Sequence, residues 1–583
     1  MTIIDYSIVL IFILWAIYTG LSNFKQASKN TVEYFLAGRS LNSWQAGFSM
    51  AATQFAADTP LLVAGLIATG GITSIWRLQI YGVSFIFITI IFAPMWARSR
   101  VLTDIEITEI RYSGNFAFLL RMLKAIHLGT LFNCSVLAMV LLAAGRIYEI
   151  FLPWYIWLPD NVFSYVVLVT NHFPDFVSSS VDSQTTKSVS ASNYFSLLIT
   201  MLVTWSYSTT GGLRSVVRTD MSQLLLMFVG TISFAVILYL NATSSQLGLR
   251  EVLNESYGKV KASDLLSLFN NELGIFALLV IGIQWIAQVN SDGSGYLAQR
   301  ILACRSESEA QKACLIFTVT QIVIRSFFWI IIGVSLLILY PANSNGGSLD
   351  VSYRELTYVL GMKDYLPVGL AGIMLTAMLA ALASTIDTHL NWGSSYWTND
   401  LYHRGLCDRI LKRVPSDSEL VFVARIANLV ILVLAVTIAV NISSIQKAWE
   451  FSLLFGSGFG LVLMLRWLWW RVTVYCEIAA GVGSIMTIFF VYDIESSIAL
   501  LSVFAISSIL VVFFAFFGPR EDEETLLKFY RMIKPVGFWG PIAQKCGDSA
   551  SLSLNKLKSD ILKVFSLVFL IFGSYILLVK TFF

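Results

Sequence analysis

The sequence predicts an all-α integral membrane protein, and three observations support this prediction. First, the 583 residues are 56% hydrophobic and only 13% charged, and the mean hydropathy is +0.73. A soluble chain of this size could not bury so much apolar surface. Second, about fourteen apolar stretches are long enough to cross a bilayer. Third, two of these spans are interrupted by polar residues and lie five spans apart, which is typical of a transporter built from two inverted five-helix repeats.

The predicted spans lie near 4–22, 45–70, 74–97, 118–150, 192–210, 221–241, 273–299, 314–340, 367–393, 421–441, 447–470, 474–491, 496–517 and 561–579. If the N-terminus is outside, the inner loops hold roughly 24 lysines and arginines and the outer loops roughly 8, a bias that sets orientation. We therefore predict a multi-pass protein of the cell membrane with an external N-terminus and a cytoplasmic loop at 518–560.

These spans divide the chain into seven parts. The parts are a first peripheral helix with a cytoplasmic loop (1–44), a first five-helix repeat (45–241), an extracellular loop (242–272), a second five-helix repeat (273–470), two peripheral helices (471–517), a cytoplasmic linker (518–560) and a last peripheral helix (561–583). The net charge of +3 gives no reason to expect a nucleic-acid partner. The six cysteines show no metal-binding spacing.

The stretch 365–402 carries the strongest chemical signal, because polar residues follow one another inside an apolar helix. An acid such as Asp387 at membrane depth costs roughly 2.5–3.5 kcal/mol unless it has a partner, a cation or water. Ala381, Ser384, Thr385 and Thr388 share one helix face. Hydroxyl, carboxylate and carbonyl oxygens are the ligands of hard cations, so we expect Na+ to bind between this face and a neighbouring helix. The alternative is a packing seam whose hydroxyls bond to their own helix.

The two interrupted spans are expected to unwind near the middle of the membrane. The first contains Gln54, Asp58, Thr59 and Pro60, and this proline removes a backbone donor and disfavours helix at the residue before it. The second contains a polar, glycine-containing break at Asn290–Gly295. Half-helices of this kind frame a substrate and ion site in transporters. The alternative is a pair of kinks satisfied by neighbouring helices.

Four motifs resemble the sodium:solute symporter family, which includes the sodium/glucose and sodium/proline cotransporters. They are EYFLAGRSLNSW at 33–44, YSTTGGLRSVVRTDMSQ at 207–223, QRILACRSESEAQKA at 299–313, and LAALASTID followed by SSYWTNDLY at 379–402. The resemblance covers about residues 30–470 and does not identify a substrate subgroup. It implies a leucine-transporter-type core of ten helices, with about four peripheral helices around it.

The resemblance also implies a sodium site between the first and eighth core helices. Its residues would be Ala52 and Phe55, through their backbone carbonyls, and Ala381, Ser384 and Thr385.

A second sodium site beside the first is implied by further matches to some relatives. Its residues would be Asp220, Ser384, Asp387 and Thr388. The alternative for Asp220 is a capping role at the positive end of a helix.

The substrate-binding candidates are Gln54, Asp58, Trp76, Arg77, Gln79 and Tyr296. Arg77 is expected either to pair with Asp58, to hold a substrate carboxylate, or to extend to the outer surface. Arg77 favours an anion or zwitterion and Asp58 an amine or polyol, so the solute is not named. Arg325 is expected to be structural, and the QR motif that contains Arg300 is expected to act in gating or orientation.

We predict Na+-coupled secondary active import of a small organic solute, such as a sugar, amino acid or carboxylate, by alternating access. The predicted partners are this solute, sodium ions and the lipid bilayer. The alternatives are a membrane solute or ion sensor, or a carrier that is coupled to protons through Asp387 or Asp220. An enzyme is not expected, because the four histidines lie on scattered elements.

Overall fold

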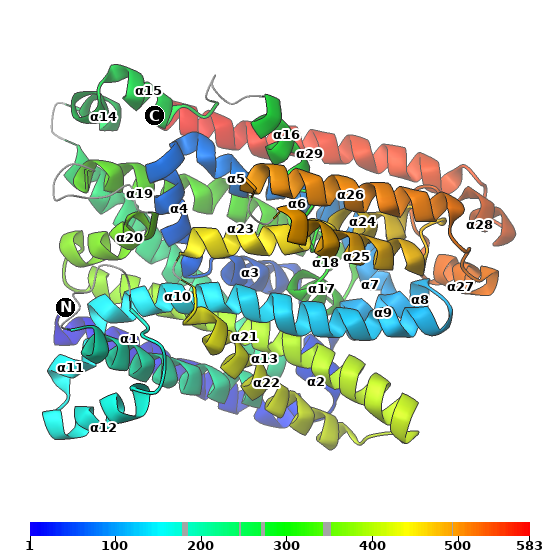
Figure 1. Ribbon diagram of the computed structural model, residues 1–583, viewed down its shortest axis with the longest axis horizontal. Helices are drawn as coiled ribbons and strands as arrows, with labels where there is room; N and C mark the ends of the chain where they lie inside the picture. The colour runs from blue at the N-terminus through cyan, green and yellow to red at the C-terminus, as the bar shows by residue number, and fades with distance from the viewer. Residues whose placement is uncertain (178–184, 244–246, 270–274, 342–350, 443, 492–493) are drawn as a thin grey trace.

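The computed structural model describes residues 1–177, 185–243, 247–269, 275–341, 351–442, 444–491 and 494–583, without the side chains of 207–210 and 275–277. Within these ranges the regular structure is helical, apart from two isolated backbone bridges, Leu41 to Cys304 and Trp469 to Phe538. Most of the long helices run along the long axis of the molecule (Figure 1). The predicted all-α architecture is confirmed.

Ten stretches of the described chain are long and apolar enough to cross a bilayer without a break. They are α1 (Ile3–Ala27); Ile72–Ser99, with α5 (Trp76–Gln79), α6 (Tyr81–Phe87) and α7 (Ala93–Ser99); Gly114–Trp157, with α9 (Gly114–Ile126), α10 (Asn133–Phe151) and α11 (Trp154–Trp157); Gly211–Ala242, which is the second half of α13 (Thr186–Ala242); Glu307–Leu339, with α18 (Glu307–Val319) and α19 (Ser326–Leu339); Leu370–Leu411, with α21 (Leu370–Ser395); α22 (Asp417–Ala439); α25 (Val474–Val491); α26 (Ser496–Phe517); and α29 (Leu552–Phe582). Segments of π-helix continue several of them: η3 (Ile88–Phe92), η5 (His127–Phe132), η6 (Thr320–Arg325) and η7 (Tyr396–Leu411).

Two bent pairs raise this number to twelve: α3 (Ser43–Gln54) with α4 (Asp58–Gly70), and α23 (Ile445–Gly456) with α24 (Gly460–Leu468). The predicted total of fourteen is not confirmed. The predicted spans 192–210 and 273–299 correspond to the first half of α13 and to the pair α16 (Ile275–Gln284) and α17 (Tyr296–Leu302). Within the described residues, neither is among the stretches that are long and apolar enough to cross a bilayer.

Both predicted interruptions are present. The helices α3 and α4 meet at an angle of 54° across residues 55–57, and Pro60 is the third residue of α4. The break between α16 and α17 ends at Gly295, whose φ of 79° favours glycine. A Cβ atom there would lie 3.2 Å from the ring of Trp392 on α21. This close approach is how the second break reaches the neighbouring helix.

The kink that divides α13 lies at Gly212, between the predicted spans 192–210 and 221–241. Its φ is 55°, and a Cβ atom at this position would lie 2.7 Å from the carbonyl oxygen of Tyr34. The second half of α13 packs against both α3 and α21. The helices expected to hold ions, α3, α13 and α21, are therefore in mutual contact, and α3 is itself the first half of a broken span.

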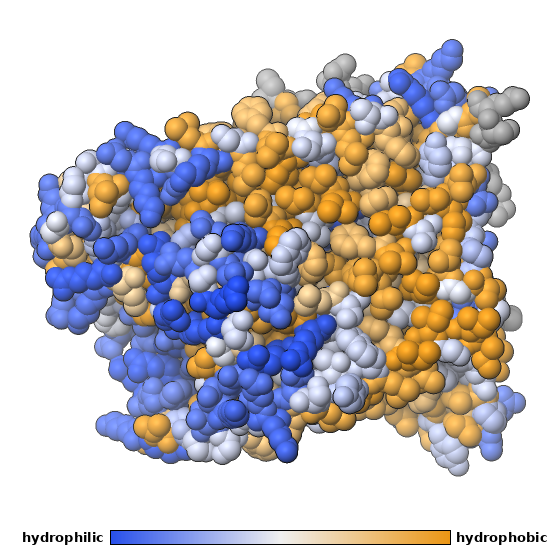
Figure 2. All heavy atoms as spheres, turned by 180° about the vertical axis from the view of Figure 1, so that it is seen from behind, coloured by the Kyte–Doolittle hydropathy of each residue, from blue (hydrophilic) through white to orange (hydrophobic). Residues whose placement is uncertain are grey.

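The two ends of the molecule carry different segments (Figure 1). The N-terminus lies at the same end as α11, α12 (Asp160–Thr170), α14 (Leu249–Tyr257), α15 (Lys259–Leu266) and α20 (Val351–Tyr365). The opposite end carries α8 (Ile107–Arg111), α27 (Glu523–Ile533) and α28 (Gly540–Lys545). Figure 2 shows hydrophilic side chains gathered toward that opposite end and a broad apolar surface over much of the remainder. The N-terminus and the 518–560 segment thus lie at opposite ends, as the loop charges require.

The segment 518–560 is packed against the helices rather than being a simple linker. The side chains of Leu526, Phe529 and Trp539 are buried. The indole Nε1 of Trp539 donates to the carbonyl of Trp467 at 2.8 Å. Glu521 accepts hydrogen bonds from the backbone N–H groups of Ser113 and Val474, which precede and begin the helices α9 and α25. This segment is polar on average, but its helix α27 is amphipathic and packs its apolar face against the end of the bundle.

Candidate functional site

The predicted sodium site lies where the end of α3 meets the middle of α21. The hydroxyl Oγ1 of Thr385 lies 3.3 Å from the carbonyl oxygen of Thr53 on α3 and 3.0 Å from that of Ala381 on its own helix. The carbonyl of Ala52 accepts the N–H of Phe55 at 3.1 Å, where α3 ends. All of these residues are buried. Carbonyl and hydroxyl oxygens that converge away from water form the ligand chemistry of a hard cation.

Ser384, the remaining predicted ligand, turns toward α13. Its hydroxyl donates to Oδ1 of Asp220 at 2.6 Å, and the hydroxyl of Ser49 on α3 donates to Oδ2 of the same carboxylate at 2.5 Å. Asp220 lies eight residues after the kink at Gly212, inside α13, so it does not cap a helix. The carboxylate instead joins three helices at a fully buried position.

A buried arginine lies beside this carboxylate. Nη2 of Arg300 lies 4.0 Å from Oδ2 of Asp220 and donates to Oγ1 of Thr388 at 2.6 Å. Its Nε lies 3.3 Å from the hydroxyl of Ser49, and its Nη1 donates to the side chain of Gln299 at 2.8 Å. Arg300 is fully buried. A positive charge of the protein itself therefore lies among the residues assigned to the second sodium site.

The other members of that second site surround the same point. Oγ1 of Thr388 lies 3.0 Å from Oγ1 of Thr53 on α3 and 3.5 Å from a carboxylate oxygen of Asp387. Asp387 is fully buried. Arg300 thus lies between Asp220 on α13 and Thr388 on α21, and Asp387 is the neighbour of Thr388 on the same helix.

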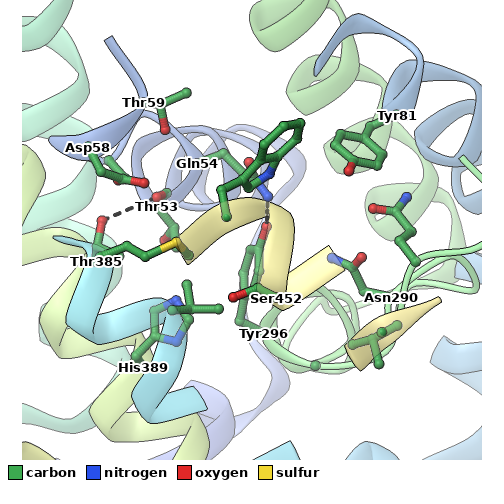
Figure 3. Close-up of a pocket in the computed structure, with 18 of the residues that line it drawn as sticks. Thr53, Gln54, Asp58, Thr59, Tyr81, Asn290, Tyr296, Thr385, His389 and Ser452 are labelled. Carbon is green, nitrogen blue, oxygen red and sulfur yellow. Dashed lines mark hydrogen bonds between the residues drawn. The ribbon is translucent and has the colours of Figure 1, made fainter. Parts of the chain in front are cut away.

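A cavity of about 220 Å³ opens beside the predicted sodium site. It lies between the α3–α4 break, α10, the break before α17, α21 and α23. Thr385 lines it, and so do three of the six substrate candidates, Gln54, Asp58 and Tyr296. Figure 3 shows these side chains directed into the same space, with the Gln54 amide bonded to the hydroxyl of Tyr296. The ion site and the cavity therefore share a wall.

The other three substrate candidates are not brought to this cavity. Trp76 stacks on Phe572 of α29 at 5.8 Å and donates to the carbonyl of Leu268. Arg77 pairs with Glu450 at 3.0 Å, not with Asp58, in a separate hollow. The amide of Gln79 is buried against the carbonyl of Ile322, at 3.4 Å. Helix periodicity could not predict this, because the partners of these residues, Phe572, Glu450 and Ile322, lie on other helices that are remote in the sequence.

Three further residues of the site were read differently or missed. Arg325, expected to be structural, lines the cavity and donates through Nη1 to the carbonyl of Gln54 at 2.5 Å. Ser49 and His389 had no assigned role, although His389 lines the cavity and its Nδ1 lies 2.5 Å from the amide oxygen of Asn133. An arginine inside an apolar span is a functional signal by itself, so Arg325 was detectable from the sequence. Ser49 was not, because a lone serine carries no such signal.

Comparisons with known proteins match most of this chain to one family. Residues 34–170 and 160–483 match the model of the sodium:solute symporter family. The chain is 24% identical over 480 residues to the sodium/glucose cotransporter of Vibrio parahaemolyticus, covering 79% of each protein. It is 23% identical over 463 residues to sodium/myo-inositol cotransporter 2 of Bos taurus, covering 74% of this chain and 60% of the relative. Several relatives are thus considerably longer than this chain.

The structure also resembles a Na+-coupled sialic acid symporter in a substrate-bound outward-open state. The TM-score is 0.64 at 18% sequence identity, and the match covers 89% of this chain and 99% of the other. This likeness shows a shared fold and confirms the predicted leucine-transporter-type core. Family, relatives and fold together support Na+-coupled solute symport, with sodium as the coupling ion. Because the family model matches most of its length, this chain belongs to the sodium:solute symporter family.

Proposed function

We propose that this Na+-coupled symporter holds its coupling ion between α3 and α21. The ligands would be the carbonyl oxygens of Ala52, Phe55 and Ala381 and the hydroxyl oxygens of Ser384 and Thr385. The observation that carries the proposal is the contact of Thr385 Oγ1 with the carbonyl of Thr53, at 3.3 Å across the two helices. A cation inserted at this seam would attract oxygens from both helices.

Ion binding at this seam would prepare the neighbouring cavity for the solute. Na+ would hold the end of α3 against α21, and Gln54 and Asp58 follow directly from that end of α3. The solute would then bind in the cavity, and rocking of the helices would open it to the other end of the molecule. With the N-terminus outside, transport would run inward, toward the end that carries α27 and α28.

We propose that one Na+ is transported per cycle, because a positive charge of the protein already lies among the residues of the predicted second sodium site. The guanidinium of Arg300 donates to Thr388 and lies 4.0 Å from Asp220. A sodium ion among the same groups would be repelled by this fixed charge in a region shielded from water. Arg300 would then act as an internal cation that neutralises the buried carboxylates.

Na+-dependent thermal stability of the full-length purified protein tests the proposed ion site, with K+ as the control salt. A ligand that binds only the folded state, and is present at a concentration of about 100 times its Kd, adds about 2.7 kcal/mol to the free energy of unfolding. We expect Na+ to raise the Tm of the wild type, and Ser384→Ala and Thr385→Ala to remove the rise. Thr376→Ala is the matched control, because this buried hydroxyl on the same helix bonds only within α21 in the described structure.

Two outcomes would contradict the proposed site. If Na+ and K+ acted alike on the wild type, sodium would not bind at this seam. If Thr376→Ala removed the Na+ effect as fully as Thr385→Ala, the loss would reflect general weakening of α21. A rise in Tm with falling pH that Asp220→Asn or Asp387→Asn removed would instead favour the proton-coupled alternative.

A further inference from the structure

The cavity contains two opposite charges that do not neutralise each other directly. Among the described residues that line it, Asp58 and Arg325 are the acidic and basic members, and the rest are apolar, hydroxyl, amide or imidazole side chains. No ion pair joins the two within the described structure, whereas the neighbouring Arg77 and Glu450 are paired at 3.0 Å. Each of the two therefore keeps bonding capacity for a bound solute.

Asp58 is the first residue of the half-helix α4, where the helix dipole favours a negative charge. Its Oδ1 is shielded from solvent, and no hydrogen-bond partner is found for it among the described residues. The half-helix end is the place where a transporter of this kind would receive an anionic group of the solute. Here the protein's own carboxylate fills that place. The free oxygen therefore suits a donor, and a protonated amine is the strongest donor available.

Arg325 closes the other half of the break. Its Nη1 donates to the carbonyl of Gln54 at the end of α3, and its guanidinium lies 4.4 Å over the ring of Trp329. These contacts hold the group in a fixed orientation. Its Nε has no hydrogen-bond partner among the described residues. A guanidinium that is held in place and incompletely bonded suits a carboxylate.

Charge balance then distinguishes the classes of solute. A neutral polyol could replace the water with hydroxyl hydrogen bonds, but it would leave both charges without an opposite charge. An amine or a carboxylate alone would pair one charge and leave the other desolvated, which is unfavourable in a buried site. A zwitterion pairs both. The apolar side chains around the cavity, among them Leu62, Phe85 and Met139, would accommodate its carbon skeleton.

We propose that the transported solute is a small zwitterion whose ammonium group binds Asp58 and whose carboxylate binds Arg325. This inference rests on the proposed function and names the class of its solute. The two charges in the cavity favour a zwitterion over an uncharged polyol as the solute of this protein.

The test uses the full-length protein in saturating Na+ and measures thermal shifts with a panel of small probes that differ in the charges they carry. L-valine carries both charges, isobutylamine only the amine, and isobutyrate only the carboxylate. γ-Aminobutyrate places the two charges farther apart, and glucose carries none. We expect L-valine or γ-aminobutyrate to stabilise the protein more than isobutylamine, isobutyrate or glucose. If glucose or isobutyrate stabilised it more, or if neither zwitterion did, the inference would be overturned.

Variants assign each charge to its partner. We expect Asp58→Asn to lower the affinity for the zwitterion roughly 30-fold or more, the equivalent of about 2 kcal/mol for a buried charged contact. Arg325→Gln should lower the affinity for the zwitterion and leave the affinity for isobutylamine unchanged. Glu450→Gln is the matched control, because this acid lies in the adjacent hollow and pairs with Arg77. Equal losses in Asp58→Asn and Glu450→Gln would contradict the assignment.

The Na+ response without solute separates this inference from the proposed function. If the wild type responds to Na+ but neither zwitterion binds, only the solute class is wrong. If Asp58→Asn loses the Na+ response itself, Asp58 is a cation ligand and the inference is overturned. If Asp58→Asn keeps the Na+ response, the variant is folded, and its loss of zwitterion binding supports the inference.

Discussion

Nη2 of Arg300 lies 2.6 Å from Oγ1 of Thr388, so a guanidinium occupies part of the place that family resemblance assigns to a second sodium ion. The same arginine lies 4.0 Å from Asp220, whose carboxylate also accepts hydrogen bonds from Ser49 and Ser384. A fixed positive charge thus balances buried negative charge where three helices meet. Its presence changes what can be expected of the ion count and of the stability of this region.

The first prediction is that one Na+ accompanies each solute. With a potential of ~100 mV and a ~tenfold Na+ gradient, one ion supplies about 3.7 kcal/mol, which supports about 500-fold accumulation. Two ions would support about 10⁵-fold. The measurement is the solute gradient at which net flux stops in proteoliposomes with set Na+ gradients. A limit that rises with the square of the Na+ ratio would contradict a single ion.

The second prediction concerns removal of the internal cation. Arg300→Gln should destabilise the protein by about 3–5 kcal/mol, because it removes the positive charge beside the buried Asp220 carboxylate. The double variant Asp220→Asn/Arg300→Gln should be more stable than Arg300→Gln alone, because it removes both charges. Denaturation in detergent measures both effects. High Na+ should partly restore Arg300→Gln by filling the vacated place, with K+ as the control; additive losses in the double variant would refute the pairing.

The third prediction uses the glycine at the end of the second break. Gly295→Ala should lower the free energy of unfolding by roughly 1–3 kcal/mol, because its φ of 79° is strained for alanine. The added methyl group would also lie 3.2 Å from Trp392, so solute affinity should fall. Gly282→Ala is the control, since a Cβ atom there has open space within α16. If both variants behaved alike, the left-handed conformation at Gly295 would not matter.

The fourth prediction follows from the position of Arg77 outside the cavity. Arg77→Ala should change solute affinity by less than about twofold, because Arg77 pairs with Glu450 in a separate hollow and does not line the cavity. Loss of this half-buried pair should lower the stability of the protein by only about 0–1 kcal/mol. Binding measured by thermal shift in saturating Na+ checks this. A tenfold loss of affinity with an unchanged Na+ response would restore the idea that Arg77 holds a substrate carboxylate.

The fifth prediction concerns the packed segment 518–560. Trp539 is buried, lies 5.4 Å from the ring of Phe529 and has the guanidinium of Arg111 at 4.9 Å from its ring centre. Trp539→Ala should therefore destabilise the protein by about 3–5 kcal/mol. Phe538→Ala, at an exposed neighbouring aromatic, should change stability by less than about 0.5 kcal/mol. Equal effects on thermal stability would show that this segment does not pack as described.

Local features of the sequence were sufficient to predict the general architecture. Apolar length identified most of the spans, and Pro60 and Gly295 identified the two breaks, because proline and glycine restrict or free the backbone by themselves. The polar face that contains Ser384 and Thr385 was also detectable, since helix periodicity places such residues on one side. These properties depend only on residues a few positions apart.

The partners of the buried charges could be decided only by the tertiary structure. Asp220, Arg300 and Thr388 come from three distant parts of the chain, and periodicity assigns each a face of its helix but not the group opposite that face. The same reason explains why Arg77 pairs with Glu450, and why Asp58 and Arg325 share a cavity without neutralising each other. The sequence by itself determined most of the apolar spans and the two places where spans break. Only the packing of helices decided which charges meet, because electrostatic pairing depends on distances between segments that are remote in the sequence.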